Sequence, residues 1–225
     1  LNEVYDKIQN GMSDMMDKSL MPDLQIDGDI DTKFPFIVPH LHYLLGEILR
    51  NSLQATIDFH GTSTKTKLPP IQVTVINAKK QVLFRISDQG GGLPHNKVSE
   101  LWSFGKSPEV ARKSIANFHE IPGLLANLQK SQKNIDQEDF ESNEVFLNQT
   151  SLVDINTKLK KSTLSNLIER PHQFHLGLGL PICKVYADYW HGDLLMDCLE
   201  GYGTDTCLTL SKLGYHSNII QLDKA

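Results

Sequence analysis

One long stretch, from Val38 to Gly61, constrains the fold of this chain more than any other. Its apolar side chains recur every three or four residues, which places them on one face of an α-helix. The members of this apolar stripe are Leu41, Leu44, Leu45, Ile48, Ala55 and Phe59, with the small polar residue Ser52 as one interruption. Pro39 suits the first turn of such a helix and Gly61 suits its end. The pattern therefore predicts a helix over 38–60.

A polar face adjoins the apolar stripe on the same predicted helix. Glu47, Asn51, Gln54 and Asp58 recur at helical spacing, so their side chains share one side. A carboxylate and an amide one turn apart can place a general base beside an oxygen ligand for Mg²⁺. The same pattern is typical of the solvated face of an amphipathic helix, and the helix alone favours that plainer interpretation.

Composition narrows the class of protein. The 225 residues allow one large domain or a domain with an appended segment, and a hydrophobic content of 40% is enough for a core. The net charge of −5 is mild, and no apolar run approaches a membrane span, so neither nucleic acid nor a membrane is expected as the main partner. Three cysteines without a CxxC spacing favour a reducing compartment. Because the chain opens on Leu1, we expect a processed or excised portion whose targeting signal lies out of view.

The remaining elements follow in chain order. Residues 1–20 are predicted as a helix, and residues 22–39, with three prolines and several aspartates, as a loop or arm. Alternating, β-branched runs predict two hairpins, formed by strands 71–77 with 81–87 and 193–199 with 205–210. A second helix is predicted over 182–190. Together these elements predict an α+β sandwich of one sheet and one helical layer.

Two segments carry weaker signals. Residues 98–116 have a weakly helical pattern. Residues 117–175 are rich in Asn, Gln, Lys and Ser without clear strands, which is typical of a lid, an insert or disorder.

Two glycine-rich stretches flank these elements. Asp88 ends a predicted strand and is followed by Gly90 and Gly92. A carboxylate held there can accept a hydrogen bond from the exocyclic amine of adenine, although a simple turn explains the motif about as well when it stands alone. Further on, Gly177-Leu178-Gly179-Leu180 precedes the second helix, where backbone N–H groups form an anion site suited to phosphates. Thr204, before the last strand, is placed to support a base pocket.

The order of these motifs resembles a known nucleotide-binding domain. ExxxN on a helix, DxGxG after a strand, GLGL at a helix start and GT before a strand follow one another here as in histidine kinases, Hsp90-type chaperones, gyrase and MutL. The resemblance implies the Bergerat-type ATP-binding fold, a two-layer α/β sandwich whose mixed, mostly antiparallel sheet is covered by helices on one face.

A closer resemblance connects the chain to the mitochondrial kinases of pyruvate dehydrogenase and branched-chain α-ketoacid dehydrogenase. The segment from Glu47 to Thr56 is similar to their ELxKNAxRAT, and Ile86 to Pro94 to their ISDRGGGxP. Leu178 to Asp193 is similar to YGLPxSRxYARYxxGD, and Glu200 to Asp205 to EGxGTD. These matches cover about residues 36–107 and 175–212.

The resemblance implies a role for each matching residue. Glu47 would be the general base that takes the proton of the target serine, and Asn51 would hold Mg²⁺ between the phosphates. Asp88 and Thr204 would bind the adenine end. The full ATP-binding set implied in this way is Glu47, Arg50, Asn51, Gln54, Asp88, Gly90, Gly92, Ser107, Pro108, Gly177, Leu178, Gly179, Leu180 and Thr204.

The chain also departs from the family pattern. Tyr43 stands where the pyruvate dehydrogenase kinases carry a histidine and the branched-chain kinase carries tyrosine, and His175 replaces the first glycine of GxGxGL. The lid is longer than the family's, and no Asp-Trp pair occurs near the C-terminus. The family's amino-terminal helical bundle is not within this sequence.

The resemblance thus implies an ATP-dependent protein serine kinase of the mitochondrial matrix that phosphorylates and inactivates the E1 subunit of the pyruvate dehydrogenase complex. It implies a kinase domain over 36–213 with a lid insert at about 117–175, a connecting helix and arm over 1–35, and a tail over 214–225. The missing bundle would bind the E2 lipoyl domain, and the protein would form a homo- or heterodimer. Two alternatives stay open: a kinase of the branched-chain dehydrogenase, and an ATP-gated binding protein without transfer activity.

Overall fold

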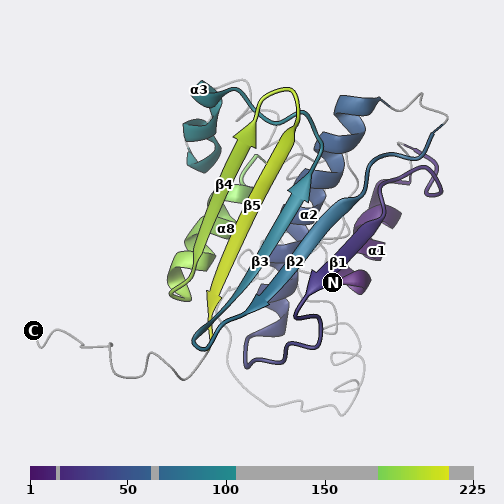
Figure 1. Ribbon diagram of the computed structural model, residues 1–225. Coiled ribbons are helices and arrows are strands. Elements are labelled where there is room, and N and C mark those ends of the chain that lie inside the picture. The colour runs from purple at the N-terminus through teal and green to yellow at the C-terminus, as the bar shows by residue number, and fades with distance from the viewer. Residues whose placement is uncertain (14–15, 62–65, 105–176, 213–225) are drawn as a thin grey trace, which may run out of the picture.

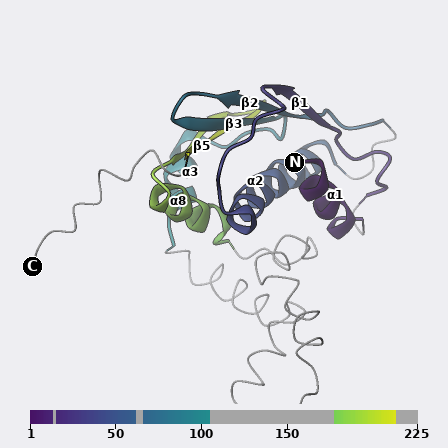
Figure 2. The same cartoon turned by 90° about the horizontal axis from the view of Figure 1, so that it is seen from below.

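The chain folds into a five-stranded sheet with helices on one of its faces, as a computed structural model shows (Figures 1 and 2). The structure describes residues 1–13, 16–61, 66–104 and 177–212. The elements in chain order are α1 (Asn2–Gly11), β1 (Leu24–Gly28), α2 (Val38–His60), β2 (Ile71–Asn77), β3 (Gln81–Asp88), α3 (His95–Val98), η1 (Ser99–Trp102), α8 (Gly179–Tyr189), β4 (Asp193–Leu199) and β5 (Gly203–Ser211). The predicted α+β sandwich is therefore confirmed.

The sheet has the strand order β1-β2-β3-β5-β4. Both predicted hairpins are present, and β3 pairs with β5 in antiparallel register, with Asp88 opposite Thr204. This pairing joins the two hairpins and brings residues that are distant in sequence together at one end of the central strands. It positions the loop after β3 beside the turn that precedes β5.

The prediction of a loop or arm over residues 22–39 was wrong in part. Leu24–Gly28 forms an edge strand that pairs in parallel with β2, from Leu24 opposite Ile71 to Gly28 opposite Val75. The strand is short, and its only apolar residues, Leu24 and Ile26, are half-buried. Short, charged strands are common at sheet edges, and their local sequence carries little strand signal.

The amino-terminal helix is shorter than predicted. It ends at Gly11, and Met12 forms its C-cap, whereas the apolar spacing predicted a helix to residue 20. The chain beyond Gly11 still contributes to the core, because Met12, Met16 and Met21 are buried. The apolar spacing therefore indicated which side chains are buried, although the helix does not continue. Glycine is a weak helix former, which favours a break at this point.

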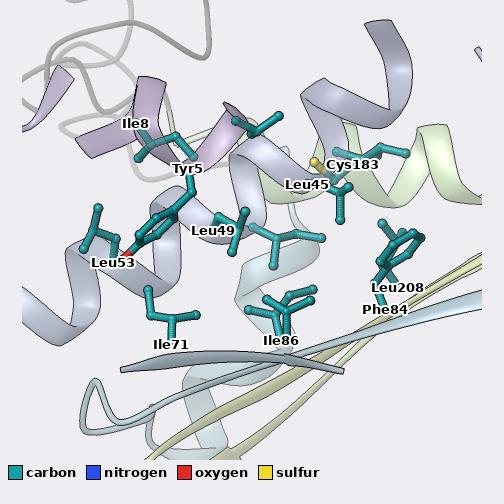
Figure 3. Close-up of a cluster of buried hydrophobic side chains, with 14 of the residues drawn as sticks. Tyr5, Ile8, Leu45, Leu49, Leu53, Ile71, Phe84, Ile86, Cys183 and Leu208 are labelled. Carbon is teal, nitrogen blue, oxygen red and sulfur yellow. The ribbon is translucent and has the colours of Figure 1, made fainter. Parts of the chain in front are cut away.

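Helix α2 has the predicted bounds and lies at the centre of the helical layer. Gly61 ends it with a φ of 80° and donates its N–H to the carbonyl of Ile57 at 2.8 Å. Figure 3 shows Tyr5 of α1 and Leu49 and Leu53 of α2 over the sheet residue Ile71. Leu49 and Leu53 lie outside the predicted apolar stripe, yet both are fully buried because α1 covers that side of α2.

The other helices differ modestly from expectation. Helix α8 begins at Gly179, earlier than the predicted 182, since Pro181 is tolerated in a first turn where its missing N–H has no partner to lose. The weakly helical segment begins as α3 and η1, and its part beyond residue 104 lies outside the described residues, as do the predicted lid and tail. Within the described parts, no helix has the length and apolar character that crossing a membrane requires.

A test of this core replaces Leu49 with alanine. Leu49 is fully buried between α1 and the sheet, so Leu49→Ala should lower the free energy of unfolding by about 2–5 kcal/mol in urea denaturation. Val185→Ala is the control, because Val185 on α8 is 55% exposed and its loss should cost less than about 0.5 kcal/mol. Equal effects of the two substitutions would contradict the packing described here.

Candidate functional site

A cavity of about 480 Å³ opens where α2, the loop after β3, α8 and the β4–β5 hairpin meet. Its size lies within the range of small-molecule sites. The wall is mainly apolar, with a few polar groups. The residues that line it are Ile48, Asn51, Ser52, Ala55, Asp58, Phe59, Asp88, Gly90, Gly92, Leu93, Leu101, Leu180, Met196, Thr204 and Thr206.

Helix α2 supplies one wall of the cavity through two neighbouring rows of side chains. Ile48, Ser52, Ala55 and Phe59 follow one another at helical spacing and form the apolar row. Asn51 and Asp58 belong to the polar row beside it. The polar face predicted from the sequence is therefore not simply solvated, since two of its four residues border the cavity.

The loop after β3 packs directly on α2 because its glycines carry no side chains. A Cβ at Gly90 would lie 2.6 Å from the Cβ of Ala55 and 2.8 Å from its backbone carbon. A Cβ at Gly92, whose φ is 61°, would lie 2.3 Å from the carbonyl oxygen of Leu199. Contacts this short are incompatible with a side chain, so both glycines are needed for the close approach of loop, helix and hairpin.

Asp88 lines the cavity and is only 7% exposed. Burial raises the pKa of its carboxyl group, since desolvation disfavours the ionised form. Hydrogen bonds from the backbone N–H of Gly90, the Ser52 hydroxyl and the backbone N–H of Thr204 oppose that shift of the pKa. The Gly90 nitrogen donates to Oδ1 at 2.9 Å. The carboxyl group also lines the cavity, where it can accept a hydrogen bond from a bound ligand.

Thr204 lies opposite Asp88 across the β3–β5 pairing and also lines the cavity. Its hydroxyl donates to the sulfur of Cys198 at 3.8 Å, a weak bond to the neighbouring strand. The pairing of β3 with β5 thus places the two residues predicted for the adenine end side by side.

Glu47 is buried, with 1% of its surface exposed, and does not line the cavity itself. Its carboxylate lies against the first residue of α8, because a Cβ at Gly179 would be 2.2 Å from Oε2. The first turn of a helix carries positive partial charge, which favours a carboxylate there. Asn51, one turn after Glu47 on α2, does line the cavity. Glu47 and Asn51 are therefore neighbours on α2, the first at the start of α8 and the second at the cavity.

The other predicted residues are placed less directly. Arg50 is 5% exposed and is not among the lining residues. Gln54 donates through Nε2 to Oδ1 of Asp58 at 2.8 Å and so holds a carboxylate that does line the cavity. Gly177 (φ 66°) and Leu178, the N-cap, precede α8 without lining the cavity, and Ser107 and Pro108 lie outside the described residues.

Sequence reasoning missed several lining residues. Ser52 was available as a signal, because a polar residue on an apolar stripe needs a partner when buried, and that partner is Asp88. Leu93, Leu101, Met196 and Thr206 carried no such signal. Their place in the cavity depends on the pairing of strands far apart in sequence.

Asn51 is the residue that the family resemblance assigns to Mg²⁺, and an amide oxygen is a suitable ligand for that ion. Its half-buried side chain borders the cavity with an amide oxygen. In nucleotide sites Mg²⁺ takes one or two protein oxygens and completes its shell with phosphates and water, so one amide oxygen is a sufficient protein contribution. Among the described residues, no group of three or more His, Cys, Asp or Glu could hold a metal.

Comparison with known proteins agrees with this geometry. The chain is 39% identical over its whole length to pyruvate dehydrogenase (acetyl-transferring) kinase 2, mitochondrial, of Saccharomyces cerevisiae, of which it covers 48%. It is 30% identical to the mitochondrial pyruvate dehydrogenase (acetyl-transferring) kinase of Arabidopsis thaliana, over 86% of this chain and 40% of that protein. Identity to the corresponding kinase of Drosophila melanogaster is 27%, over 81% of this chain and 32% of that protein.

The chain thus spans about half the length of these curated relatives, or less. Residues 38–213 match the family described as histidine kinase-, DNA gyrase B-, and HSP90-like ATPases. This match extends from the start of α2 to just beyond β5, and so includes every element that borders the cavity. The chain therefore belongs to the family of histidine kinase-, DNA gyrase B- and HSP90-like ATPases, within which it is similar to the pyruvate dehydrogenase kinases.

Proposed function

We propose that the chain is the ATP-binding kinase domain of a protein serine kinase that phosphorylates and inactivates the E1 subunit of the pyruvate dehydrogenase complex in the mitochondrial matrix. One observation carries the proposal: Asn51 and the buried carboxyl group of Asp88 line one cavity, and Glu47, one turn before Asn51 on α2, lies against the first residue of α8. The names of the relatives support the choice of substrate and organelle. The domain bounds of 1–35, 36–213 and 214–225 stay a prediction.

The base of ATP would bind at the Asp88 end of the cavity. The carboxylate would accept a hydrogen bond from the exocyclic amine of adenine, with Thr204 beside it and apolar walls against the ring. A buried carboxylate with a raised pKa is a cost to the unliganded fold. A ligand that donates a hydrogen bond to the Asp88 carboxylate would explain why such a group lines the cavity.

The phosphates would lie toward Asn51 and the start of α8. Leu180, in the first turn of α8, lines the cavity, so the positive end of that helix lies beside it. Asn51 would hold Mg²⁺, which when bound neutralises phosphate charge and orients the transferred group. Ser107, Pro108, Gly177, Leu178 and Gly179 are proposed to border the phosphates, and Arg50 and Gln54 to support this end of the site.

Glu47 would act as the general base. The carboxylate would accept the proton of the serine hydroxyl while the serine oxygen forms its bond to the γ-phosphorus and the bond to ADP breaks. Its contact with the glycine at the start of α8 holds the carboxylate in place next to the phosphate end. Such orientation of an attacking group is a large part of phosphoryl-transfer catalysis.

Tyr43 favours a second candidate, the kinase of branched-chain α-ketoacid dehydrogenase. Tyr43 lies one turn before Glu47, is 3% exposed, and its ring centroid is 5.9 Å from that of Tyr186 on α8.

A third candidate is an ATP-gated binding protein that does not transfer phosphate. Binding to the E2 lipoyl domain and a homo- or heterodimeric state are further parts of the proposal, both of which concern the longer protein.

The first prediction concerns Asp88. The folded-state pKa of its carboxyl lies above the ordinary value of 3.8, so the ionised form destabilises the fold at neutral pH. Asp88→Asn should therefore raise the melting temperature of the nucleotide-free protein at pH 7.5 while weakening ATP binding strongly in calorimetry. The advantage of the variant should shrink as pH falls through the raised pKa and vanish below 3.8, because the wild-type carboxyl is then neutral in both states.

Asp6→Asn is the matched control, because Asp6 is an exposed aspartate on α1 that does not line the cavity. It should leave ATP affinity unchanged. An Asp88→Asn protein that binds ATP as tightly as the parent would rule out the proposed base contact.

The second prediction concerns Glu47. Glu47→Gln keeps the shape of the side chain but removes the base, so transfer of labelled phosphate from Mg-ATP should fall by about 10²-fold or more. ATP affinity should change little. The assay uses full-length protein with the E1 subunits of the pyruvate and branched-chain dehydrogenases as acceptors, and Asp88→Ala as the control without nucleotide.

Each outcome of that assay selects one candidate. Label on pyruvate dehydrogenase E1 supports the first proposal, and label on the branched-chain E1 alone supports the second. Label on neither acceptor, with ATP still bound, favours the ATP-gated protein. Undiminished transfer by Glu47→Gln would show that Glu47 is not the base.

A further inference from the structure

Phe59 is an exception on the apolar row of α2. Ile48 and Ser52 of that row are almost fully buried, at 1% and 3% exposed, whereas Phe59 is 53% exposed. It nevertheless lines the cavity. A large aromatic ring on the apolar stripe of a helix is expected to be covered. The exposure of this ring is therefore explained by its place in the cavity wall and not by packing in the core.

The ring of Phe59 is held in position by the loop after β3. Gly91 has a φ of 78°, and a Cβ there would lie 2.3 Å from Cδ2 and 2.6 Å from Cε2 of Phe59. The backbone of the loop thus lies directly against the ring. Side chains in the last turn of a helix lean toward the preceding turn, which here carries the cavity residue Ala55.

His60 strengthens this arrangement from the other side. Its ring meets the Phe59 ring edge to face, with centroids 5.1 Å apart and planes at 86°. Nε2 of His60 lies 3.0 Å from the carbonyl oxygen of Gln89, which can only accept, so Nε2 donates. The end of α2 is thereby tied to the same loop that holds Asp88. Phe59 is a preorganised wall and not a loose surface side chain.

The chemistry of the neighbouring lining residues indicates what covers the ring. Asp88 offers a hydrogen-bond acceptor in the cavity wall, and Leu93, Leu101 and Met196 offer apolar surface. A buried carboxylate in a mainly apolar wall suits a flat heteroaromatic ring that carries an amine. An aromatic side chain adds stacking or edge contact with such a ring whatever its exact substitution.

We propose that Phe59 is a base-binding residue that contacts the purine ring of the nucleotide, and that Gly91 is required because any side chain there would displace it. This inference rests on the proposed function, since it assigns a contact within the same ATP site. It adds a determinant of affinity for the base that is separate from the hydrogen bond to Asp88.

The position of Phe59 predicts a particular signature. Phe59 follows Asn51, the residue proposed to hold Mg²⁺ at the phosphates, by eight residues on α2, which is about 12 Å along the helix axis. The proposed contact is therefore with the base alone, and loss of the ring should weaken the binding of adenosine, ADP and ATP by the same factor. Phe59→Ala should raise the Kd of each about tenfold. Phe59→Tyr should bind as the parent does, and Phe59→Leu should fall between the two, because it keeps apolar area but loses the aromatic face.

The experiment measures Kd for the three ligands by calorimetry on the full-length protein and its variants. Tyr189→Ala is the matched control, an aromatic residue on α8 that is 70% exposed and does not line the cavity. Melting curves without nucleotide report folding. Folded Phe59→Tyr and Phe59→Leu proteins keep the comparison valid if the alanine variant is unstable.

The outcomes separate the inference from the function on which it rests. Equal weakening of all three ligands by Phe59→Ala, with Tyr189→Ala unchanged, supports the contact. Unchanged binding by Phe59→Ala and Phe59→Leu, with binding still lost in Asp88→Asn, overturns the contact and leaves the ATP site standing. Weaker binding of ATP alone also overturns the proposed contact, since the substitution would then act on the phosphates and not on the base. A parent protein that binds no adenosine, ADP or ATP overturns both proposals.

Discussion

The packing of the glycine loop on α2 is the interaction on which the site depends. Gly90 and Gly91 let the backbone after β3 lie directly on Ala55 and Phe59, at distances that no side chain would permit. This close approach brings the Asp88 carboxylate within reach of the Ser52 hydroxyl and places both at one cavity. Without it, the helix and the strand end would stand apart and their polar groups would not converge.

A second close contact at a glycine occurs at the start of α8. Gly179, at the start of α8, lies against the carboxylate of Glu47, so helix α8 is positioned by a glycine contact as the loop is. Gly92 and Gly203 make the matching contacts between the loop and the β4–β5 hairpin, where added Cβ atoms would lie 2.3 Å and 2.0 Å from backbone oxygens. The outline of the cavity is therefore set largely by backbone, and a few side chains decide what binds there.

Local sequence patterns predicted the elements and several of the residues that meet at the cavity, but not the whole site. Helix α2 and the two hairpins have strong periodic signals, and Asn51, Asp88 and Thr204 were predicted for the ATP site and do lie at one cavity. Strand β1 was missed because its pairing with β2 is set by tertiary contact. Leu101 and Met196 were missed for the same reason, since only the folded sheet brings η1 and β4 to α2.

Phe59 and Asp88 illustrate why a functional site departs from the rules that predict a core. A stripe residue left half exposed and a buried carboxylate with a raised pKa each make the unliganded protein less stable than an ordinary core would. The two residues lie on the elements joined by the glycine loop, so a ligand that filled the cavity would cover the ring and could donate a further hydrogen bond to the carboxylate. Because both deficits are corrected by one ligand, binding would be coupled to the stability of the α2–β3 junction, and nucleotide would act as part of the core at this end of the sheet.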